Sequence, residues 1–254
     1  MSGESNCVHM VQLALHADRL FSLARSRRLP TREVDTGYVV HALLRGLFGE
    51  DAPQPFAMLP GKGRIVPVLG YALLDDAALR RRADEYAAPE AHAAVDWSRF
   101  AAKPMPVEWS PGRRLGFRLR ACPTVRMAKA GPHHAAGAEV DVFLAKCWAT
   151  GNPEQAVDRE VVYRDWLAAQ LERRGGARLA RVAVSGFQLE PLMRRTQARE
   201  GDRKARVLRK PEVTFDGELE VVDGPGFAAL LRRGVGRHRA FGFGMLLLRP
   251  QRPC

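Results

Sequence analysis

Cysteine is scarce in this sequence. The chain of 254 residues has 4 cysteines, and no two of them form a C-x-x-C pair. That spacing excludes the common sequence pattern of a zinc site and is typical of proteins in a reducing compartment. No stretch approaches the roughly 18 consecutive apolar residues of a membrane-spanning helix, and no signal peptide is visible. These absences predict a cytoplasmic protein with no membrane partner.

Several motifs of cofactor-dependent and hydrolytic enzymes are also missing. The chain has neither a G-x-x-x-x-G-K-[ST] loop for nucleoside triphosphates nor the G-x-S-x-G elbow of serine hydrolases. Its acidic residues form no cluster of the kind used by two-metal nucleases. The glycine-rich segment GVGRHRAFGFGM, at 234–245, has Arg239 where a dinucleotide fingerprint needs its third glycine, and a strand is predicted after it instead of a helix. No cofactor is therefore expected.

What the sequence has in excess is positive charge. It contains 40 Lys and Arg against 28 Asp and Glu, for a net charge of +12. Segment 113–129 has six basic residues and no acidic one, segment 194–210 has eight basic and two acidic residues, and segment 232–239 adds four arginines. One run of charge is usually a solvated surface. Three runs, two of them beside predicted strands, favour an extended surface for a polyanion such as nucleic acid.

The hydrophobic pattern predicts the same order of elements twice. The first half has a strand at 10–17, a helix at 38–48, a hairpin at 55–74, a helix at 75–88 and a strand that follows 103–111. The second half has a strand at 115–125, a helix at 159–175, strands at 180–193 and 213–223, a helix at 224–234 and a last strand at 241–250. No structure can be assigned to an inserted stretch at 127–158.

Each half has the order β-α-β-β-α-β, which is the ferredoxin-like arrangement also found in RRM domains. The predicted fold class is therefore α+β, with two tandem ferredoxin-like domains at 10–110 and 111–254 and an N-terminal extension at 1–9. Sheets of this type bind single-stranded RNA, so the two domains predict an RNA-binding cleft that the glycine-rich loop borders.

The first helix carries a candidate catalytic group. Helical spacing places Tyr38, His41 and Arg45 on one flank, away from the apolar stripe, and near the basic loop that contains Arg25, Arg27 and Arg28. Metal-independent RNA cleavage requires removal of the 2′-hydroxyl proton, in-line attack on the phosphate and protonation of the leaving 5′-oxygen. Histidine can be the base or the acid, tyrosine can orient the hydroxyl, and arginine can stabilise the phosphorane. The alternative is a partly exposed helix histidine with no role.

Arginines and glycines are the candidate RNA contacts. In FRLR, alternation places Phe117 and Leu119 on one face of a strand and Arg118 and Arg120 on the other. Segment 194–210 is interpreted as a basic hairpin or loop, and the glycine-rich loop either lies against phosphate or is a tight turn with solvated arginines. The predicted RNA-binding residues are Arg25, Arg27, Arg28, Arg118, Arg120, Arg126, Lys129, Arg203, Lys204, Arg206, Arg209, Lys210, Gly234, Gly236, Arg237, His238 and Arg239.

One metal site can be drawn, from His133 and His134 with Glu139 and Asp141. Adjacent histidines on a glycine-rich segment rarely converge on one ion. Segment 138–144 also alternates like an ordinary strand. No metal is therefore expected.

Three segments resemble a known family. They are Tyr38-Val39-Val40-His41 with the following Leu47-Phe48, the stretch FRLRACPT at 117–124, and the glycine-rich loop with its strand, GVGRHRAFGFGMLLL, at 234–248. In this order they resemble the CRISPR-associated repeat endoribonucleases of the CasE type, from type I-E systems, and related nucleases of type IV systems. The chain differs in having Cys122 where the family has Asn.

The resemblance implies a function and partners. It implies a nuclease that cuts CRISPR repeat RNA at the base of a hairpin and leaves 2′,3′-cyclic phosphate and 5′-hydroxyl ends on mature crRNA. It also implies that the protein stays on its product as a subunit of a class 1 surveillance complex with other Cas proteins. Two alternatives stay open at this point: a non-catalytic RNA-binding subunit of such a complex, and an unrelated basic RNA-binding protein.

Overall fold

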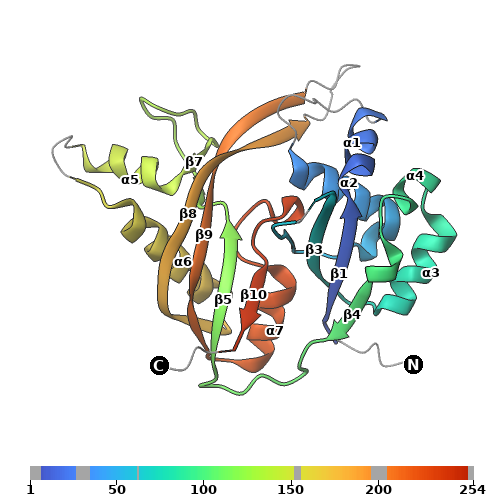
Figure 1. Cartoon of the computed structure of the whole chain (residues 1–254). Helices are drawn as coiled ribbons and strands as arrows, with labels where there is room; N and C mark the ends of the chain where they lie inside the picture. The colour runs from blue at the N-terminus through green and yellow to red at the C-terminus, as the bar shows by residue number, and fades with distance from the viewer. Residues whose placement is uncertain (1–6, 27–34, 62, 152–155, 196–204, 251–254) are drawn as a thin grey trace.

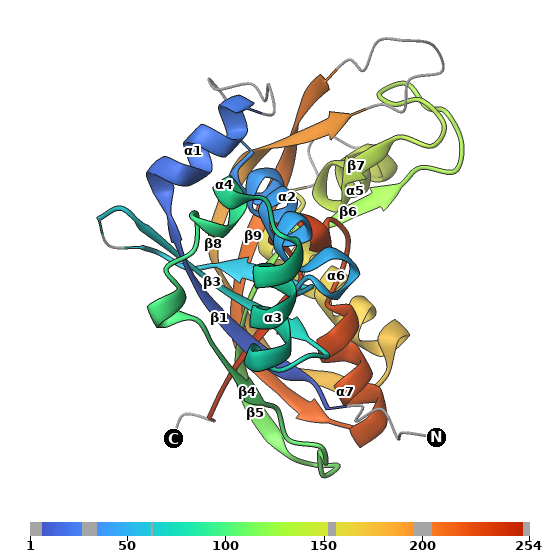
Figure 2. The same ribbon diagram turned by 90° about the vertical axis from the view of Figure 1, so that its right-hand side faces the viewer.

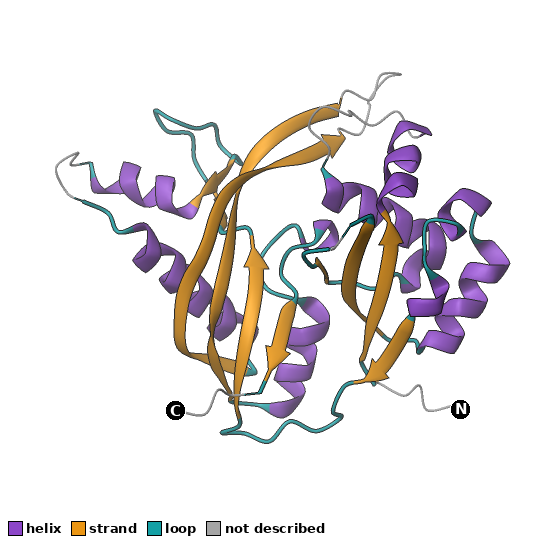
Figure 3. Cartoon of the chain, viewed as in Figure 1, coloured by secondary structure: helices purple, strands orange, loops and turns teal. Residues whose placement is uncertain are grey.

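The computed structural model describes residues 7–26, 35–61, 63–151, 156–195 and 205–250 (Figure 1). Within these ranges the chain forms two four-stranded sheets and a small two-stranded one. All of the strand pairs are antiparallel. Figure 3 distinguishes the strands of the sheets from the helices packed on them.

The first sheet has the strand order β2-β3-β1-β4. Its strands are β1 (His9–His16), β2 (Phe56–Met58), β3 (Ile65–Ala72) and β4 (Ala101–Pro104). The helices of this unit are α1 (Ala17–Ser26), α2 (Thr36–Phe48), α3 (Asp76–Tyr86) and α4 (Pro89–His92), with 3-10 turns η1 (Gly49–Asp51) and η2 (Trp97–Arg99). Figure 2 shows α2 and α3 in front of this sheet.

Helix α2 forms where the sequence predicts a helix. The carboxylate of Asp35 caps it by accepting a hydrogen bond from the backbone N–H of Tyr38 at 2.8 Å. Val40, Leu43 and Leu47 face the sheet and are at most 1% exposed. Burial of this stripe fixes which flank of α2 stays outside the core.

The second sheet has the order β10-β5-β9-β8. Its strands are β5 (Arg114–Ala121), β8 (Ala177–Arg195), β9 (Ala205–Val221) and β10 (Leu246–Arg249). Helices α6 (Arg159–Arg174) and α7 (Gly224–Arg233) share a hydrophobic core with it. In both sheets the four strands follow the spatial order second, third, first and fourth, which is the ferredoxin-like order. The structure therefore confirms the predicted fold class.

The inserted stretch differs from what the sequence predicts. It contains β7 (Glu139–Asp141), which pairs with β6 (Thr124–Arg126) just before the stretch, and α5 (Val142–Thr150). The prediction of one strand over 138–144 is wrong, because Asp141 ends β7 and its carboxylate caps α5 by accepting from the backbone N–H of Phe143. The single strand predicted over 115–125 is likewise divided into β5 and β6.

The last strand also begins later than predicted. It starts at Leu246 instead of residue 241, because Gly242 and Gly244 both have positive φ angles that interrupt extended backbone. Residues Arg239–Phe241 form a 3-10 turn, η3, instead. Helix α1 is a further element that the sequence pattern did not predict. In the described part of the chain no helix has the length and apolar character needed to cross a membrane.

The two sheets meet through a shared contact. Tyr71 of β3 is buried, and its hydroxyl donates a hydrogen bond of 2.8 Å to the backbone carbonyl of Leu246 in β10. Val8 and Ala57 from the first unit also pack in the core of the second. These contacts fix the first unit, which includes α2, against the second unit, which includes the glycine-rich loop before β10.

Candidate functional site

Helix α2 presents the three predicted catalytic residues on the flank outside the core. Tyr38 and His41 are half-buried, whereas Arg45 is exposed and forms an ion pair with Glu50. Burial lowers the pKa of His41 below the ordinary value of 6.5, and the nearby positive charge of Arg45 lowers it further. The imidazole is therefore neutral near pH 7 and can accept a proton.

The glycine-rich loop reaches this flank through one aromatic residue. The ring of Phe241, in η3, stacks on Tyr38 with centroids 5.9 Å apart and meets the edge of His41 at 5.5 Å. Gly37 allows this approach, because a Cβ atom there would overlap the backbone carbonyl of Phe241. The contact joins residues from the two ends of the sequence into one site, and Phe241 is a member that the sequence did not identify.

The glycine-rich loop contains one uncommon backbone conformation and is held in place by backbone hydrogen bonds. His238 adopts a left-handed conformation with φ 58°, which is uncommon for a residue with a side chain. The N–H of Val235 donates to Gly244 at 2.8 Å, and the N–H of Gly244 donates to Arg120 at 2.7 Å. These bonds fix the base of the loop against β5.

Glu139 of β7 holds the middle of the loop. Its carboxylate is 2.5 Å from Nε2 of His238, accepts from the hydroxyl of Thr124 at 3.0 Å, and lies 3.6–3.8 Å from the cationic groups of Arg237 and Lys210. Burial alone would raise the pKa of Glu139, but the hydrogen bond and charge of His238 and the charge of Lys210 lower it to about 2. Glu139 is thus an anchor of the loop, which the sequence reading considered only as a metal ligand.

The residues of the alternative metal site have separate partners. His133 and His134 stack on Trp148 at 5.0 and 5.6 Å, and Asp141 accepts a hydrogen bond from the hydroxyl of Tyr163 at 2.9 Å. The four side chains therefore do not converge.

A different trio does converge, since Cys122, Glu139 and His238 each offer a ligand atom within 4.8 Å of the others. Burial raises the pKa of the Cys122 thiol to about 12, and Glu139 raises it as well. Glu139 is bound to His238 and lies beside the cationic groups of Arg237 and Lys210, so the trio belongs to the contacts that hold the loop.

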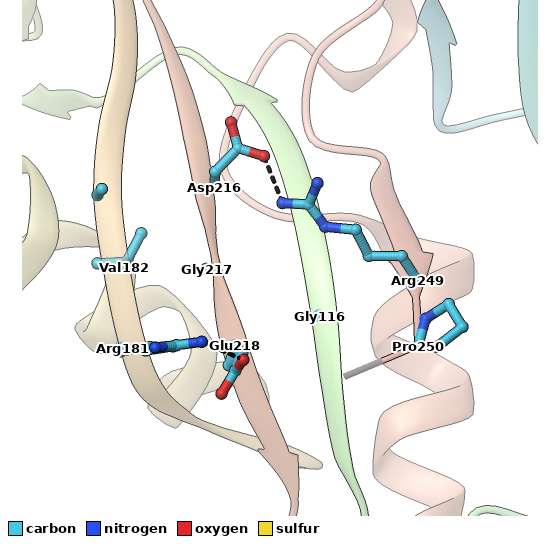
Figure 4. A pocket seen from close by; sticks show the side chains of 9 residues that line it. Gly116, Arg181, Val182, Asp216, Gly217, Glu218, Arg249 and Pro250 are labelled. Atoms are coloured by element: carbon cyan, nitrogen blue, oxygen red, sulfur yellow. Dashed lines mark hydrogen bonds and ion pairs between the residues drawn. The ribbon is translucent and has the colours of Figure 1, made fainter. Parts of the chain in front are cut away.

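The arginines of the second sheet are paired with acids on β9. Phe117 and Leu119 are fully buried, and Arg118 and Arg120 point to the opposite face, as alternation predicts. Carboxylates of β9 face arginines of β5, β8 and β10 across the strands, and Figure 4 shows the part of this face around Asp216. The pairs are Arg114 and Arg178 with Glu220, Arg181 with Glu218, Arg118 and Arg249 with Asp216, and Arg120 with Glu212. Contact of Arg118 and Arg120 with phosphate stays a prediction, and it requires exchange of these partners.

The other predicted RNA contacts lie in several places. Arg25 is exposed in the last turn of α1, and Lys129 and Arg209 are exposed. Arg126 donates to the carbonyl of Gly137 at 3.2 Å, and Lys210 donates to the carbonyl of Glu139 at 2.6 Å. Arg206 lies in β9, where only the backbone is described. Four predicted contacts lie outside the described residues: Arg27, Arg28, Arg203 and Lys204.

Gly234, Gly236, Arg237, His238 and Arg239 all belong to the glycine-rich loop, and the last four line a hollow of about 700 Å³. Helix α6 forms the opposite wall with residues that the sequence reading did not select, among them Trp166, Gln170, Arg173 and Arg174. The sequence offers little indication of these residues, because a basic pair such as Arg173 and Arg174 is common in the last turn of a helix.

Comparison with known proteins gives a consistent result. The family model described as "CRISPR associated protein" matches residues 9–250. The CRISPR-associated endoribonuclease Cse3 of Thermus thermophilus is 32% identical over 153 residues, which are 59% of this chain and 63% of that relative. The aligned part thus spans less than two thirds of the relative's length.

Solved structures match over more of the chain. A structure of the endoribonuclease Cse3 bound to a 19-nucleotide RNA is 26% identical, with a TM-score of 0.61, and the match covers 96% of this chain and 100% of that one. Thermus thermophilus Cse3 bound to an RNA that represents a pre-cleavage complex has the same identity and coverage, with a TM-score of 0.59. Cas6e from Escherichia coli K-12, at 20% identity and a TM-score of 0.55 over 96% of this chain and 100% of its own, shares the fold.

Proposed function

We propose that this chain, which belongs to the CRISPR associated protein family, is a metal-independent endoribonuclease that processes CRISPR repeat RNA. The observation that carries the proposal is the contact of Tyr38 and His41 with Phe241, which joins the candidate catalytic helix to the glycine-rich loop. The similarity to RNA-bound Cse3 structures over nearly the whole chain supports it.

The proposed reaction uses groups of this chain and solvent water. His41 is neutral near pH 7 and accepts the proton of the ribose 2′-hydroxyl, which Tyr38 orients. The 2′-oxygen then attacks the neighbouring phosphorus, and the bond from phosphorus to the 5′-oxygen breaks. The leaving oxygen takes up a proton from solvent water, and His41 releases its proton to solvent. Arg45 stabilises the additional negative charge on the phosphorane. The products carry a 2′,3′-cyclic phosphate and a 5′-hydroxyl.

The long hairpin of β8 and β9 is proposed to hold the RNA stem. Pairing of β9 with β5 ends at Val213, whereas pairing with β8 continues to Ala205. The hairpin therefore extends past the end of β5, and Figure 1 shows it arching toward the first unit. Basic residues of this segment, including Arg206 and Arg209, contact the phosphate backbone of the stem, and recognition depends on the shape of the stem base.

Retention of the product is the second part of the proposal. The protein stays on the crRNA hairpin as a subunit of a class 1 surveillance complex with other Cas proteins. A structure of a CRISPR RNA-guided surveillance complex includes a chain with this fold, at 14% identity and a TM-score of 0.57. A non-catalytic RNA-binding subunit would share the fold and the basic surface, so a cleavage assay has to separate the two functions.

The test is single-turnover cleavage of end-labelled repeat RNA in EDTA. The wild-type protein is expected to make one cut, and a 2′-deoxy substitution at the cut nucleotide is expected to abolish it. H41A is expected to lower the rate at least ~10²-fold, the typical contribution of a general base, with unchanged RNA affinity. H133A is the control, because His133 is exposed and stacks on Trp148 away from α2. Wild-type activity in H41A would contradict the role of this histidine, and RNA binding without cleavage would support the non-catalytic function.

A further inference from the structure

Three arginines lie beside the glycine-rich loop, and within the described residues none of them forms an ion pair with an acid. They are Arg174 at the end of α6, Arg233 at the end of α7 and Arg239 at the start of η3. Burial lowers the pKa of Arg239, and the positive charges of Arg174 and Arg233 lower it further. Arg239 is held in place because its guanidinium donates to the backbone carbonyl of Arg233.

Helix termini alone do not account for this group. Cations are favourable at the last turn of a helix, which explains Arg174 and Arg233 singly. Bringing both to a third, partly buried guanidinium is unfavourable, because like charges in a medium less polar than water repel strongly. Arg174 and Arg233 form no ion pair with any acid in the described part of the chain. This sets them apart from the arginines of β5, which face carboxylates of β9.

The hollow that Arg174 and Arg239 line contains aromatic and amide groups as well as charges. The uncharged groups are the indole of Trp166, the amide of Gln170 and the ring of Phe241. Its carboxylate, Glu139, is occupied by His238, Arg237 and Lys210. Aromatic rings and guanidinium groups in one groove are typical of sites for single-stranded nucleic acid, where a base packs on the ring and a phosphate binds the cations.

The position of the hollow relates it to the candidate catalytic helix. Arg174 and Arg239 line this hollow, whereas Arg233 lines the neighbouring one, which Arg239 also borders. The neighbouring hollow contains Arg45 and two carboxylates, Glu50 and Asp51. These carboxylates are paired with Arg45 and Arg82. Two residues after Arg239 in the chain, Phe241 contacts Tyr38 and His41. A strand that passes from α2 across the loop would therefore meet Arg239 first and Trp166 next.

We infer that Arg174, Arg233 and Arg239, together with Trp166, form a subsite for single-stranded RNA next to the cut. The guanidinium groups bind a backbone phosphate, and the indole provides the surface for a base. The inference rests on the proposed function, since it places the subsite on the flank of the scissile nucleotide and not on the hairpin stem.

Equilibrium binding of two non-cleavable RNAs tests the subsite. Both carry a 2′-deoxy nucleotide at the cut; one has the hairpin with its single-stranded flanks and the other has the stem and loop alone. R174A and R233A are each expected to weaken binding of the flanked RNA about tenfold, as loss of a charge-assisted contact does. Each is also expected to reduce the dependence of log affinity on log salt by about 0.7 per lost phosphate contact. Neither is expected to change binding of the stem alone.

Two further variants make the test specific. R164A removes an exposed arginine from the same helix that is paired with Asp165, so it should bind both RNAs like the wild type. Trp166 also stacks on Phe215 of the core, with centroids 6.4 Å apart, and W166L is therefore used, with a thermal melt to verify folding. W166L is expected to weaken only the flanked RNA.

The outcomes separate this inference from the proposed activity. Wild-type affinity of R174A and R233A for the flanked RNA would overturn the subsite, even if the protein cuts repeat RNA. Equal weakening on both RNAs would overturn its assignment to a single strand. A wild-type protein that binds without cutting, and loses affinity for the flanked RNA in R174A, would contradict the nuclease proposal and retain the subsite.

Discussion

His41 is the residue whose chemistry depends most on its neighbours. Its ring is partly buried beside Phe241, and burial is the larger cause of its lowered pKa. The second cause, the charge of Arg45, is adjustable by mutation because Arg45 lies at the surface. The pH dependence of an Arg45 variant therefore reports on the protonation of His41 and leaves the imidazole itself unchanged.

R45A is expected to move the acidic limb of the pH–rate profile to higher pH. Removing the positive charge raises the pKa of His41. The imidazole then stays protonated up to a higher pH, so cleavage begins at a higher pH than in the wild type. The midpoint should stay below 6.5, because burial remains. The maximal rate should fall as well, since Arg45 is the proposed phosphorane donor. Single-turnover rates from acid to neutral pH, with ring NMR shifts of His41, measure the change.

R80A is the matched control for this titration, because Arg80 is a helix arginine of similar exposure that pairs with Asp84 on α3. Its acidic limb should coincide with that of the wild type. An unmoved limb in R45A, or a shift toward lower pH, would contradict the assignment of the limb to His41.

The elements of the site differ in how far the sequence predicts them. Helix α2 was predictable because its apolar stripe, its cap at Asp35 and its polar flank are local patterns. The contact of Phe241 with α2 was not, because no pattern in the loop indicates which distant surface it meets. Glu139 lies in the stretch 127–158, whose short strand and helix give too little periodicity to identify. The predicted position of the flank outside the core was therefore correct, its catalytic role stays a prediction, and the contacts with Phe241 depend on tertiary structure.

The close approach of α2 and the loop can be tested at Gly37. G37A places a Cβ atom against the backbone carbonyl of Phe241, which has no side-chain freedom to move away. The expected cost is about 1–3 kcal/mol in the free energy of unfolding, together with a slower cleavage rate as the loop shifts from Tyr38 and His41. Urea unfolding and single-turnover kinetics measure the two effects.

Gly186 in β8 provides the comparison for Gly37, because a Cβ atom there would meet its nearest neighbour, Thr214, at an ordinary 3.6 Å. G186A should retain both stability and cleavage. Full activity and stability in G37A would show that the loop does not need its present distance from α2.

At the scale of the whole molecule, two sheets of the same strand order are joined through buried contacts, which include the hydrogen bond from Tyr71 to Leu246. The hydroxyl group is buried, and burial raises the pKa of Tyr71 well above its ordinary value, so it remains a donor across the physiological range. Because α2 belongs to one sheet and the loop leads into the other, this junction determines whether the site is assembled.

Y71F is expected to lower the free energy of unfolding by about 1 kcal/mol, because it removes one buried hydrogen bond and leaves the carbonyl of Leu246 without this donor. Denaturation in urea measures the difference. Tyr86 is 76% exposed, so Y86F is a matched substitution that should unfold like the wild type. Equal stability of Y71F and Y86F would show that the junction does not depend on this hydroxyl.

The carboxylates of β9 compete with a bound nucleic acid for the arginines of the second sheet. On the second sheet, a phosphate could reach the guanidinium of Arg118 or Arg249 only by competing with Asp216, which both already contact at 2.9 and 2.5 Å. In other folds of this class the broad face of the sheet binds RNA. Here the arginines of that face are neutralised by the carboxylates of β9. A bound strand would thus meet Arg174 and Arg233, which form no ion pair with an acid in the described residues, more readily than the arginines of this face.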